Sequence, residues 1–434
     1  MNITSNFSSL FDEKIINQLA HSCGLIKRNR KLNGLDLFIT VLCSVVNQVP
    51  SYNIASTTLF TQRRKDVSRQ RLHKVISSST FSVFFKQVMD HIWQTRIDPS
   101  GQIRKRKFKR VLIQDSTILK LPKRLFKQYS GVANAAVSVA NCRVQLCFDL
   151  MSNLLQTLSI DSYSINDAMA RNYIKAQKGD MVIRDRGYFA LDQFIKFSKE
   201  GVFFIVRTKS NNKFYDRFGK PINLVEVLSK QKTDVLEVRL TSEEGPMFYL
   251  FAQRVSDKIA AERCRSAKLS AKGRTLSKNT IEHLKWSTFL TNLEPKTNDF
   301  NDIWQIYSLR WRIEIIFKAL KSHLNLDSIH NVSSNQLHII IHARIALIFL
   351  ITNNVYKPLQ KLTYRLKQNK QISLIKLVNV LIVDLDLMTK TLLHFCKNKR
   401  KRYFDIIDKL IKASSYDSRN RPNYKTTEDE VILS

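Results

Sequence analysis

The sequence predicts an α/β protein in which a mixed sheet with helices on its faces is interrupted by a β-rich insertion and flanked by helical N-terminal and C-terminal regions. Three observations predict this class. Within residues 99–208, aliphatic runs alternate with amphipathic segments, as they do in a mixed sheet covered by helices. Residues 209–300 contain segments with the two-residue period of strands, and both ends of the chain place apolar residues at helical spacing.

The composition indicates a globular protein with a polyanionic partner. Of the 434 residues, 44% are hydrophobic and 25% are charged, which excludes a disordered chain. The formal net charge is +35 and is spread over the whole chain. A distributed positive field favours nucleic acid as the partner, although a ribosome-associated protein or a member of a basic proteome would carry a similar charge.

Neither a zinc site nor a membrane is expected. The six cysteines form no CxxC pair and have no histidine pair near them, which predicts reduced thiols in a cytosolic protein. The N-terminus has no basic start followed by an apolar core, so it is not a signal peptide. The most apolar run, Leu337 to Ile351, is interrupted by charged and imidazole side chains and is shorter than the roughly 18 residues of a membrane span. We therefore expect a buried helix and a cytoplasmic, nucleoid-associated protein.

The first predicted domain, residues 1–98, is helical. LDLFITVLCSVV and FSVFFKQVMDHIW have the apolar spacing of helices. The segment TQRRKDVSRQRLHK, Thr61 to Lys74, is expected to form a basic helix of this domain. Arg96 to Arg110 combines a turn with a basic run and is expected to be a linker.

Residues 99–208 are predicted to form the first part of the core. Its expected strands are VLIQDSTILKL, RVQLCFDLM, LLQTLSI, DMVIRDRGYF and VFFIVRTK, and its expected helices are INDAMARNYIKAQKG and ALDQFIKFSKEG. The insertion, residues 209–300, has DVLEVRL, MFYLFAQRV and WSTFLTNL as strands. Residues 301–332 supply the final core helix. Residues 333–434 form a basic helical region, including KNKRKR, with a polar tail expected to be disordered.

The final core helix carries an unusual polar face. At about 100° per residue, one face of a continuous helix collects Tyr307, Arg310, Glu314, Lys318 and Lys321. Glu314 is the sole acid between Ile303 and Asn325, whereas a solvated face normally mixes both signs at a spacing of four residues. Two interpretations stand: an ordinary surface, or an active site that handles a polyanion.

Two aspartates favour the active site. Asp115 follows the aliphatic run VLIQ, and Asp185 follows MVIR. An ionisable group beside an apolar strand is costly unless it is paired or binds metal, although aspartates at strand ends also cap turns. Together with Glu314 they supply the oxygen ligands that Mg²⁺ prefers.

The motifs around these residues carry a resemblance to a known family. Tyr307, Arg310, Glu314 and Lys321 spell Y-(2)-R-(3)-E-(6)-K, which resembles the signature of the insertion sequence 4 family of DDE transposases. The aspartates stand in QDST and in DRGYF, and the latter is similar to the family's D-x-G-[YF] motif. The resemblance runs from about residue 10 to residue 331 and implies an RNase H-like core with a β-rich insertion between the second aspartate and the glutamate.

The same resemblance implies roles for the site residues. Asp115, Asp185 and Glu314 would be the catalytic residues and would bind Mg²⁺ or Mn²⁺, as two ions. The implied DNA contacts are Tyr307, Arg310, Lys318, Lys321, Trp286 and Arg207. Trp286, in LKWSTFLTN, would stack on a base that is flipped out as a DNA hairpin forms, although the core of a strand would also accept it.

The implied activity is cut-and-paste transposition of an insertion sequence by phosphodiester hydrolysis, hairpin formation and strand transfer. The partners would be double-stranded DNA, as terminal inverted repeats and target, and a second copy of the chain in a homodimeric synaptic complex. Candidates for reading the repeats, or for nonspecific phosphate contact, are Arg63, Arg64, Lys65, Arg69 and Arg71. The alternatives are a catalytically silent DNA-binding protein derived from a transposase, and an RNase H-like nuclease.

Overall fold

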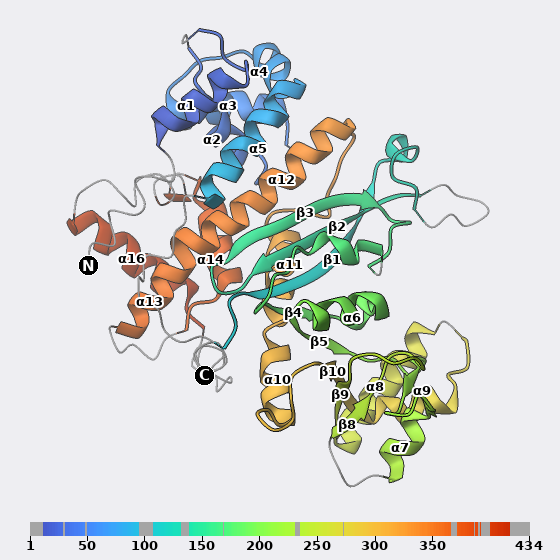
Figure 1. The fold of residues 1–434 in the computed structure, drawn as a ribbon. Helices are drawn as coiled ribbons and strands as arrows, with labels where there is room; N and C mark the ends of the chain where they lie inside the picture. Colours follow the sequence, from blue (N-terminus) through green and yellow to red (C-terminus); the bar gives the residue numbers. More distant parts are fainter. Residues whose placement is uncertain are drawn as a thin grey trace.

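A computed structural model describes most of the chain. The described residues are 12–28, 31–47, 50–94, 107–131, 139–167, 169–230, 235–271, 273–365, 371–385, 387–388, 391 and 400–416. Most of the expected linker, much of KNKRKR and the polar tail lie outside them. The proposed division into five segments remains a prediction, whereas the α/β class is confirmed (Figure 1).

One eight-stranded sheet organises the molecule, in the order β3-β2-β1-β4-β5-β10-β9-β8. Its strands are β1 Val111–Leu121, β2 Ala140–Asp149, β3 Leu154–Ser162, β4 Met181–Arg184, β5 Phe203–Arg207, β8 Val235–Val238, β9 Phe248–Arg254 and β10 Trp286–Thr291. Strands β1 to β3 form an antiparallel meander, and β4 and β5 run parallel to β1. This mixed order, with helices packed against the sheet, is the RNase H-like core that the resemblance implies.

The insertion extends the core sheet and contains helices as well as strands. Strands β8, β9 and β10 continue the sheet beyond β5, and a small hairpin joins β6 Phe214–Tyr215 to β7 Pro221–Ile222. Its helices are α7 Leu224–Lys230, α8 Asp257–Ser270 and α9 Lys278–Leu284. Much of the basic stretch between MFYLFAQRV and WSTFLTNL is therefore helical, and it lies in the lobe at the lower right of Figure 1.

The helix predicted from INDAMARNYIKAQKG is wrong. The segment forms turns and a short 3₁₀ helix, η2 Met169–Tyr173. The side chain of Asn166 accepts a hydrogen bond from the backbone N–H of Met169, and side chains that bond to nearby backbone compete with helix formation. The helix expected from ALDQFIKFSKEG is present as α6 Leu191–Lys199.

The N-terminal helices pack as a bundle above the core (Figure 1). They are α1 Glu13–Ser22, α2 Gly34–Ser44, α3 Tyr52–Arg63, α4 Arg69–Ile76 and α5 Ser79–Gln94. The single basic helix expected from Thr61 to Lys74 is wrong, because α3 ends there and Arg64 adopts the left-handed backbone conformation that caps it, with φ of 54°.

The expected buried helix is confirmed. Helix α12, Ser334–Ile351, crosses between the N-terminal bundle and the core, and its apolar side chains are buried on all sides. In the described chain, the stretch Ser334–Thr363 is long and apolar enough to cross a membrane, but 89% of its most apolar window is buried inside the protein. The remaining described C-terminal helices are α13 Lys357–Arg365, α14 Leu374–Val383 and α16 Arg400–Ser414.

Arg344 of α12 fastens the N-terminal bundle to the core. Its side chain is fully buried and donates to the carbonyl oxygens of Val45, Asn47 and Asn325 at 3.0, 3.2 and 2.7 Å. One guanidinium thus joins α2, α12 and the end of the final core helix.

We predict that Arg344→Met lowers the free energy of unfolding by about 2–3 kcal/mol, because three carbonyl oxygens lose their donor. Urea denaturation followed by circular dichroism measures this change. Arg71→Met removes an exposed arginine and should change the free energy by no more than about 0.5 kcal/mol. Equal effects of the two substitutions would contradict the role given to Arg344.

Candidate active site

The register of the parallel strands brings three predicted site residues into one row. Strand β1 pairs with β4 as far as Gln114 and Arg184, and β4 pairs with β5 as far as Arg184 and Val206. The residues that follow these pairs along the three strands are Asp115, Asp185 and Arg207. Since neighbouring strands lie about 4.8 Å apart, these residues share one edge of the sheet.

The third predicted carboxylate comes from a helix that the structure divides in two. The expected continuous helix from Tyr307 to Lys321 is wrong: α10, Phe300–Ser308, ends before a tight turn at Leu309 and Arg310, and α11, Trp311–Ser322, follows. The turn buries Leu309 in the core. The apolar residues of α11 are nevertheless buried, and they pack this helix onto β1. They are Ile313, Ile316, Phe317, Ala319 and Leu320.

Arg310 connects two of the carboxylates. Its guanidinium lies 2.5 Å from Oε1 of Glu314 and 3.4 Å from Oδ2 of Asp115. The hydroxyl of Tyr307 donates to Oδ1 of Asp185 at 3.3 Å, and the ring packs on Phe289 of β10. The turn between α10 and α11 therefore reaches all three acidic side chains.

Burial and neighbouring charges shift the pKa values of the residues in this group. Burial, with a smaller contribution from the charges of Asp185 and Glu314, raises the pKa of Asp115 to about 6, against the opposing effects of the Ser116 N–H and Arg310. Burial also raises the pKa of Tyr307. Burial alone would lower the pKa of Arg310, but the surrounding acidic groups raise it. The site therefore concentrates negative charge that one guanidinium offsets.

The other residues predicted to contact DNA differ in their burial and in their relation to this group. Arg207 is half-buried and close enough for its charge to act on the pKa of Tyr307. On α11, Lys318 is exposed and Lys321 is half-buried, and among the described residues neither forms an ion pair with the three carboxylates. Trp286 begins β10 and packs partly buried against a core cluster, so the structure is compatible with both of its expected roles.

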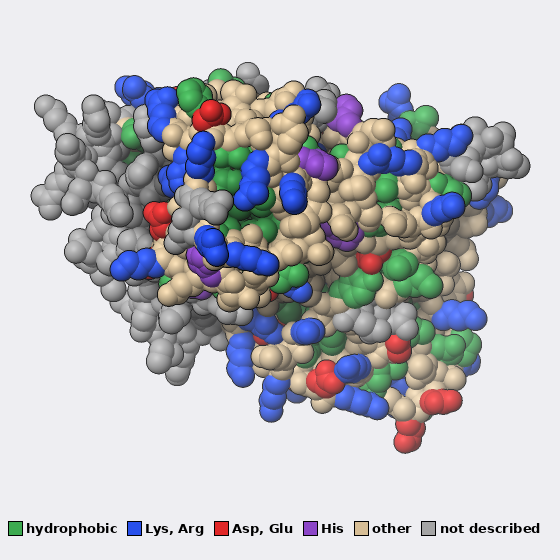
Figure 2. Space-filling model, turned by 90° about the horizontal axis from the view of Figure 1, so that it is seen from above, with side chains coloured by type: hydrophobic (Ala, Val, Ile, Leu, Met, Phe, Trp, Pro, Cys, Tyr) green, Lys and Arg blue, Asp and Glu red, His purple; other side chains and the backbone are tan. Residues whose placement is uncertain are grey.

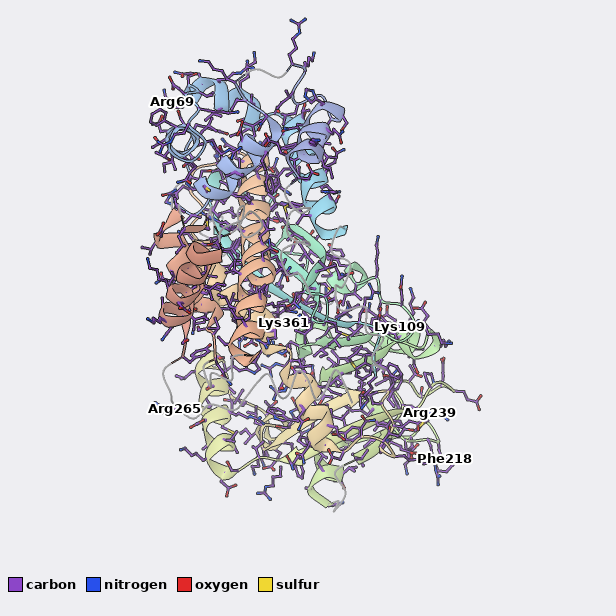
Figure 3. The ribbon with its side chains drawn as sticks, turned by 90° about the vertical axis from the view of Figure 1, so that its left-hand side faces the viewer. Arg69, Lys109, Phe218, Arg239, Arg265 and Lys361 are labelled. Carbon is purple, nitrogen blue, oxygen red and sulfur yellow. The ribbon has the colours of Figure 1, made fainter. Side chains whose placement is uncertain are left out.

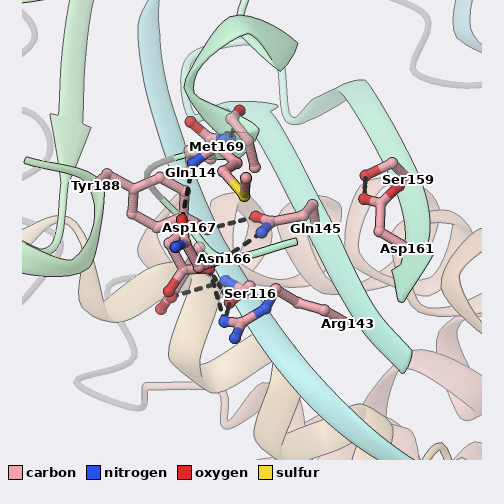
Figure 4. Close-up of polar contacts among 12 residues, drawn as sticks. Gln114, Ser116, Arg143, Gln145, Ser159, Asp161, Asn166, Asp167, Met169 and Tyr188 are labelled. Carbon is pink, nitrogen blue, oxygen red and sulfur yellow. Dashed lines mark hydrogen bonds and ion pairs between the residues drawn. The ribbon is translucent and has the colours of Figure 1, made fainter. Parts of the chain in front are cut away.

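A fourth acid, Asp167, supports the site and was missed in the sequence. Its Oδ1 accepts from Ser116 Oγ, Arg143 Nη1 and Gln145 Nε2 at 2.7, 2.9 and 3.0 Å (Figure 4). Gln145 in turn accepts from the Tyr188 hydroxyl. Asp167 thus joins the residue after Asp115 to the DRGYF turn. The segment was expected to be helical, and no local pattern marks an acid whose partners come from other strands.

Space around the DRGYF turn is restricted as well. A Cβ atom added at Gly187 would lie 3.0 Å from Oδ2 of Asp167. A side chain at this position would therefore require Asp167, or the turn that carries Asp185, to shift by a few tenths of an ångström. The glycine of the motif is explained by this close approach.

The sequence profile of the family described as "Transposase DDE domain" matches residues 106–350, which include every residue of the group built above. The chain belongs to this family. The interpretation as an insertion sequence DDE transposase is confirmed, and the protein is an enzyme that acts on DNA.

Two relatives and one solved structure illustrate the similarity of this transposase to known proteins. The transposase for insertion sequence element IS231E of Bacillus thuringiensis subsp. finitimus is 27% identical over 400 residues, covering 83% of this chain and 82% of the relative. The transposase for element IS231B of Bacillus thuringiensis subsp. berliner is 24% identical and covers 94% and 95%. The piggyBac transposase synaptic complex with hairpin DNA aligns with a TM-score of 0.44 and 12% identity, covering 99% and 89%.

Two of the basic residues proposed to read DNA have a structural role in this transposase. Arg63 and Lys65 both bind Asp36, which is fully buried in α2, the arginine at 2.8 Å. Their cationic groups are occupied by this pair of contacts, because an unpaired buried carboxylate is costly. Arg64, Arg69 and Arg71 are exposed. Arg69 lies at the end of the molecule opposite the insertion (Figure 3).

Basic side chains are not confined to one patch of the transposase. Figure 2 shows Lys and Arg side chains over much of the face seen from above, with few Asp and Glu between them. Screening shortens the reach of each charge to about 8–10 Å in physiological salt. A ligand as long as DNA would therefore be attracted by many separate contacts.

We predict that Asp115 makes the stability of the metal-free transposase depend on pH. Its pKa is raised on folding, so its contribution to stability is present below about pH 4 and is lost as the pH rises through 6. The free energy of unfolding of Asp115→Asn, relative to that of the wild type, should therefore be about 2 kcal/mol higher at pH 7 than at pH 4. Urea denaturation at both pH values, in buffer that contains a chelator, measures this difference. Glu237→Gln, which removes an exposed carboxylate of β8, is the control. If the difference in unfolding free energy between Asp115→Asn and the wild type is the same at both pH values, the raised pKa of Asp115 would be refuted.

Proposed function

We propose that this transposase moves its insertion sequence by a cut-and-paste reaction at the group formed by Asp115, Asp185 and Glu314. One observation carries the proposal: the parallel register brings the two aspartates into one row, Arg310 contacts Asp115 and Glu314, and Tyr307, whose ring lies under the Arg310 guanidinium, contacts Asp185. On this proposal, the three acidic side chains would close around a phosphodiester of DNA that lies across this end of the strands.

The three carboxylates would hold a divalent metal, Mg²⁺ or Mn²⁺, as two ions. The donor set fits, because it consists of carboxylate oxygens. Burial, with a smaller contribution from Asp185 and Glu314, raises the pKa of Asp115, and a bound cation would stabilise the charged form of this buried carboxylate. Within the described residues, no three acidic, histidine or cysteine side chains already surround a single point. Arg310 would therefore have to release Asp115 or Glu314 as the ligands close. Bound divalent ions activate a water or hydroxyl and stabilise the leaving oxygen.

The residues of the chain have distinct tasks in this proposal. Tyr307 is nearly fully buried and holds Asp185, so we assign it to positioning this carboxylate. Arg310, once released from a carboxylate, donates to the phosphate under attack. Lys318 and Lys321 contact the flanking DNA backbone, and Arg207 lies at the other end of the row.

The reaction would proceed by successive in-line displacements at one site. A hydrolysis frees a 3′-hydroxyl at the transposon end, and this hydroxyl attacks the opposite strand to form a hairpin. A second hydrolysis opens the hairpin, and strand transfer joins the ends to target DNA. The same carboxylates serve every step because each exchanges one phosphodiester oxygen for another. Two copies of the chain would hold the paired ends.

We predict that Asp115→Asn and Glu314→Gln each lower strand cleavage by about 100-fold or more, since each removes a charged ligand, while DNA binding persists. Cleavage is measured on a duplex that carries the element's end, identified from the inverted repeats beside the gene, with Mg²⁺ or Mn²⁺. Asp257→Asn, at an exposed carboxylate of α8, should cleave normally. Cleavage that survives Asp115→Asn would refute the proposed chemistry.

For Trp286 we predict a selective defect. Stacking of a flipped base contributes about 1–3 kcal/mol, so Trp286→Ala should slow hairpin formation by roughly 10-fold or more and spare the first nick. Denaturing gels that resolve nicked and hairpin products separate the two rates. Equal slowing of both would assign Trp286 to the core of the insertion.

A further inference from the structure

A basic pocket opens beside the catalytic row and has no assigned role. Its volume is about 470 Å³, and it is lined by Arg186, Lys209, Ser210, Asn211, Thr280, His283 and Leu284. Arg186 directly follows Asp185, and Lys209 lies two residues beyond Arg207. The pocket is therefore the continuation of the active-site edge towards the insertion.

The walls of the pocket are held in place by hydrogen bonds between the core and the insertion. Nε2 of His283 lies 3.3 Å from the Thr208 hydroxyl and 3.2 Å from that of Thr288. The hydroxyls of Ser210 and Thr280 lie 3.2 Å apart. Helix α9 is thus fixed to the end of β5, so the cavity has a defined shape.

Positive charges converge on this pocket without an acidic partner. No carboxylate is among its described lining residues. Arg186 and Lys209 are exposed and Arg207 is half-buried, and none of their side chains has an ion pair among the described residues. Arg263 of α8 is not a lining residue, but it donates to the carbonyl oxygen of the lining residue Leu284 at 3.4 Å. Its other acceptors are also neutral, the Trp286 carbonyl and the Ser287 hydroxyl, both at 3.0 Å.

The charges are close enough to act on one another. Burial, followed by the charges of Arg207, Arg186 and Arg263, lowers the pKa of His283 to about 4. Burial and the charge of Arg207 also lower the pKa of Arg263. The imidazole therefore stays neutral at physiological pH in the free protein, and an anion bound here would be stabilised by each of the surrounding cations.

We propose that this pocket binds a backbone phosphate of the DNA strand that lies across the three carboxylates. The inference rests on the proposed function and adds a second anchoring point to it, one that would fix the position of the strand along the active-site edge. The hydroxyls of Ser210 and Thr280 and the amide of Asn211 line the pocket beside the charged groups, and neutral donors of these kinds bind phosphate oxygens in DNA-binding proteins.

The experiment compares two exposed lysines of equal charge. Lys209 lines the pocket, whereas Lys268 lies on α8 outside its lining. Fluorescence anisotropy of a labelled DNA duplex, without divalent metal so that nothing is cleaved, gives affinity against salt concentration. Lys209→Gln should weaken binding several-fold at low salt and lower the log–log salt slope by about 1, as loss of one phosphate contact does, while Lys268→Gln should match the wild type.

A second readout reports on the pocket directly. The NMR pH titration of His283, identified by its loss in His283→Gln, should move to higher pH when DNA is bound, because a neighbouring phosphate favours the charged imidazole. Equal salt slopes for the two lysine variants, or a His283 titration that DNA leaves unchanged, would overturn the proposal. A titration moved by inorganic phosphate and not by DNA would show a site for free anions and would overturn it too.

Failure of this proposal is distinguishable from failure of the proposed function. The pocket is tested by binding alone, without metal and without cleavage. If the protein cleaves DNA but Lys209→Gln does not change binding, the proposed function stands and the phosphate site is refuted. If Lys209→Gln weakens DNA binding but the protein never cleaves DNA, the phosphate site stands and the proposed function is refuted.

Discussion

The parallel pairing of β1 with β4 and β5 is the constraint on which the site depends. Because the parallel pairing stops at Gln114, Arg184 and Val206, the residues that follow, Asp115, Asp185 and Arg207, fall in one row, and a shift of one residue would turn their side chains to the other face. Aliphatic side chains buried on both faces of these strands fix that register. The sheet therefore determines the positions of Asp115 and Asp185, whereas Glu314 is positioned by the packing of α11.

The charges at this edge oppose folding and favour a ligand. Buried acidic groups close together raise the free energy of the metal-free protein, and Arg310 reduces that cost by contacting Asp115 and Glu314. Asp167 holds the surrounding segments with three hydrogen bonds to one oxygen atom. The face drawn in Figure 2 is rich in cations and the net charge of the chain is +35, so an acidic centre is combined with a basic exterior, as the metal ions and DNA of the proposed function would require.

Local patterns predicted much of this architecture, and contacts between distant segments account for the errors. The strands around Asp115 and Asp185 were predicted because aliphatic runs mark buried strands. The break at Arg310 was not, since no proline or glycine marks it and the packing of two helices decides it. Arg63 and Lys65 looked like free cations because their partner, Asp36, lies about thirty residues earlier in the chain. Family motifs supplied the acidic group itself, which spacing alone left open.

Iron-directed cleavage of the protein tests the central claim most directly. Fe²⁺ in place of Mg²⁺, with ascorbate and peroxide, generates hydroxyl radicals that cut the backbone near the bound metal, and the fragments are mapped by mass spectrometry. If the three carboxylates share a metal site, cuts will cluster near Asp115, Asp185 and Glu314 and disappear together in Asp185→Asn. Cuts at one of the three positions alone, or cuts that persist in that variant, would contradict the account.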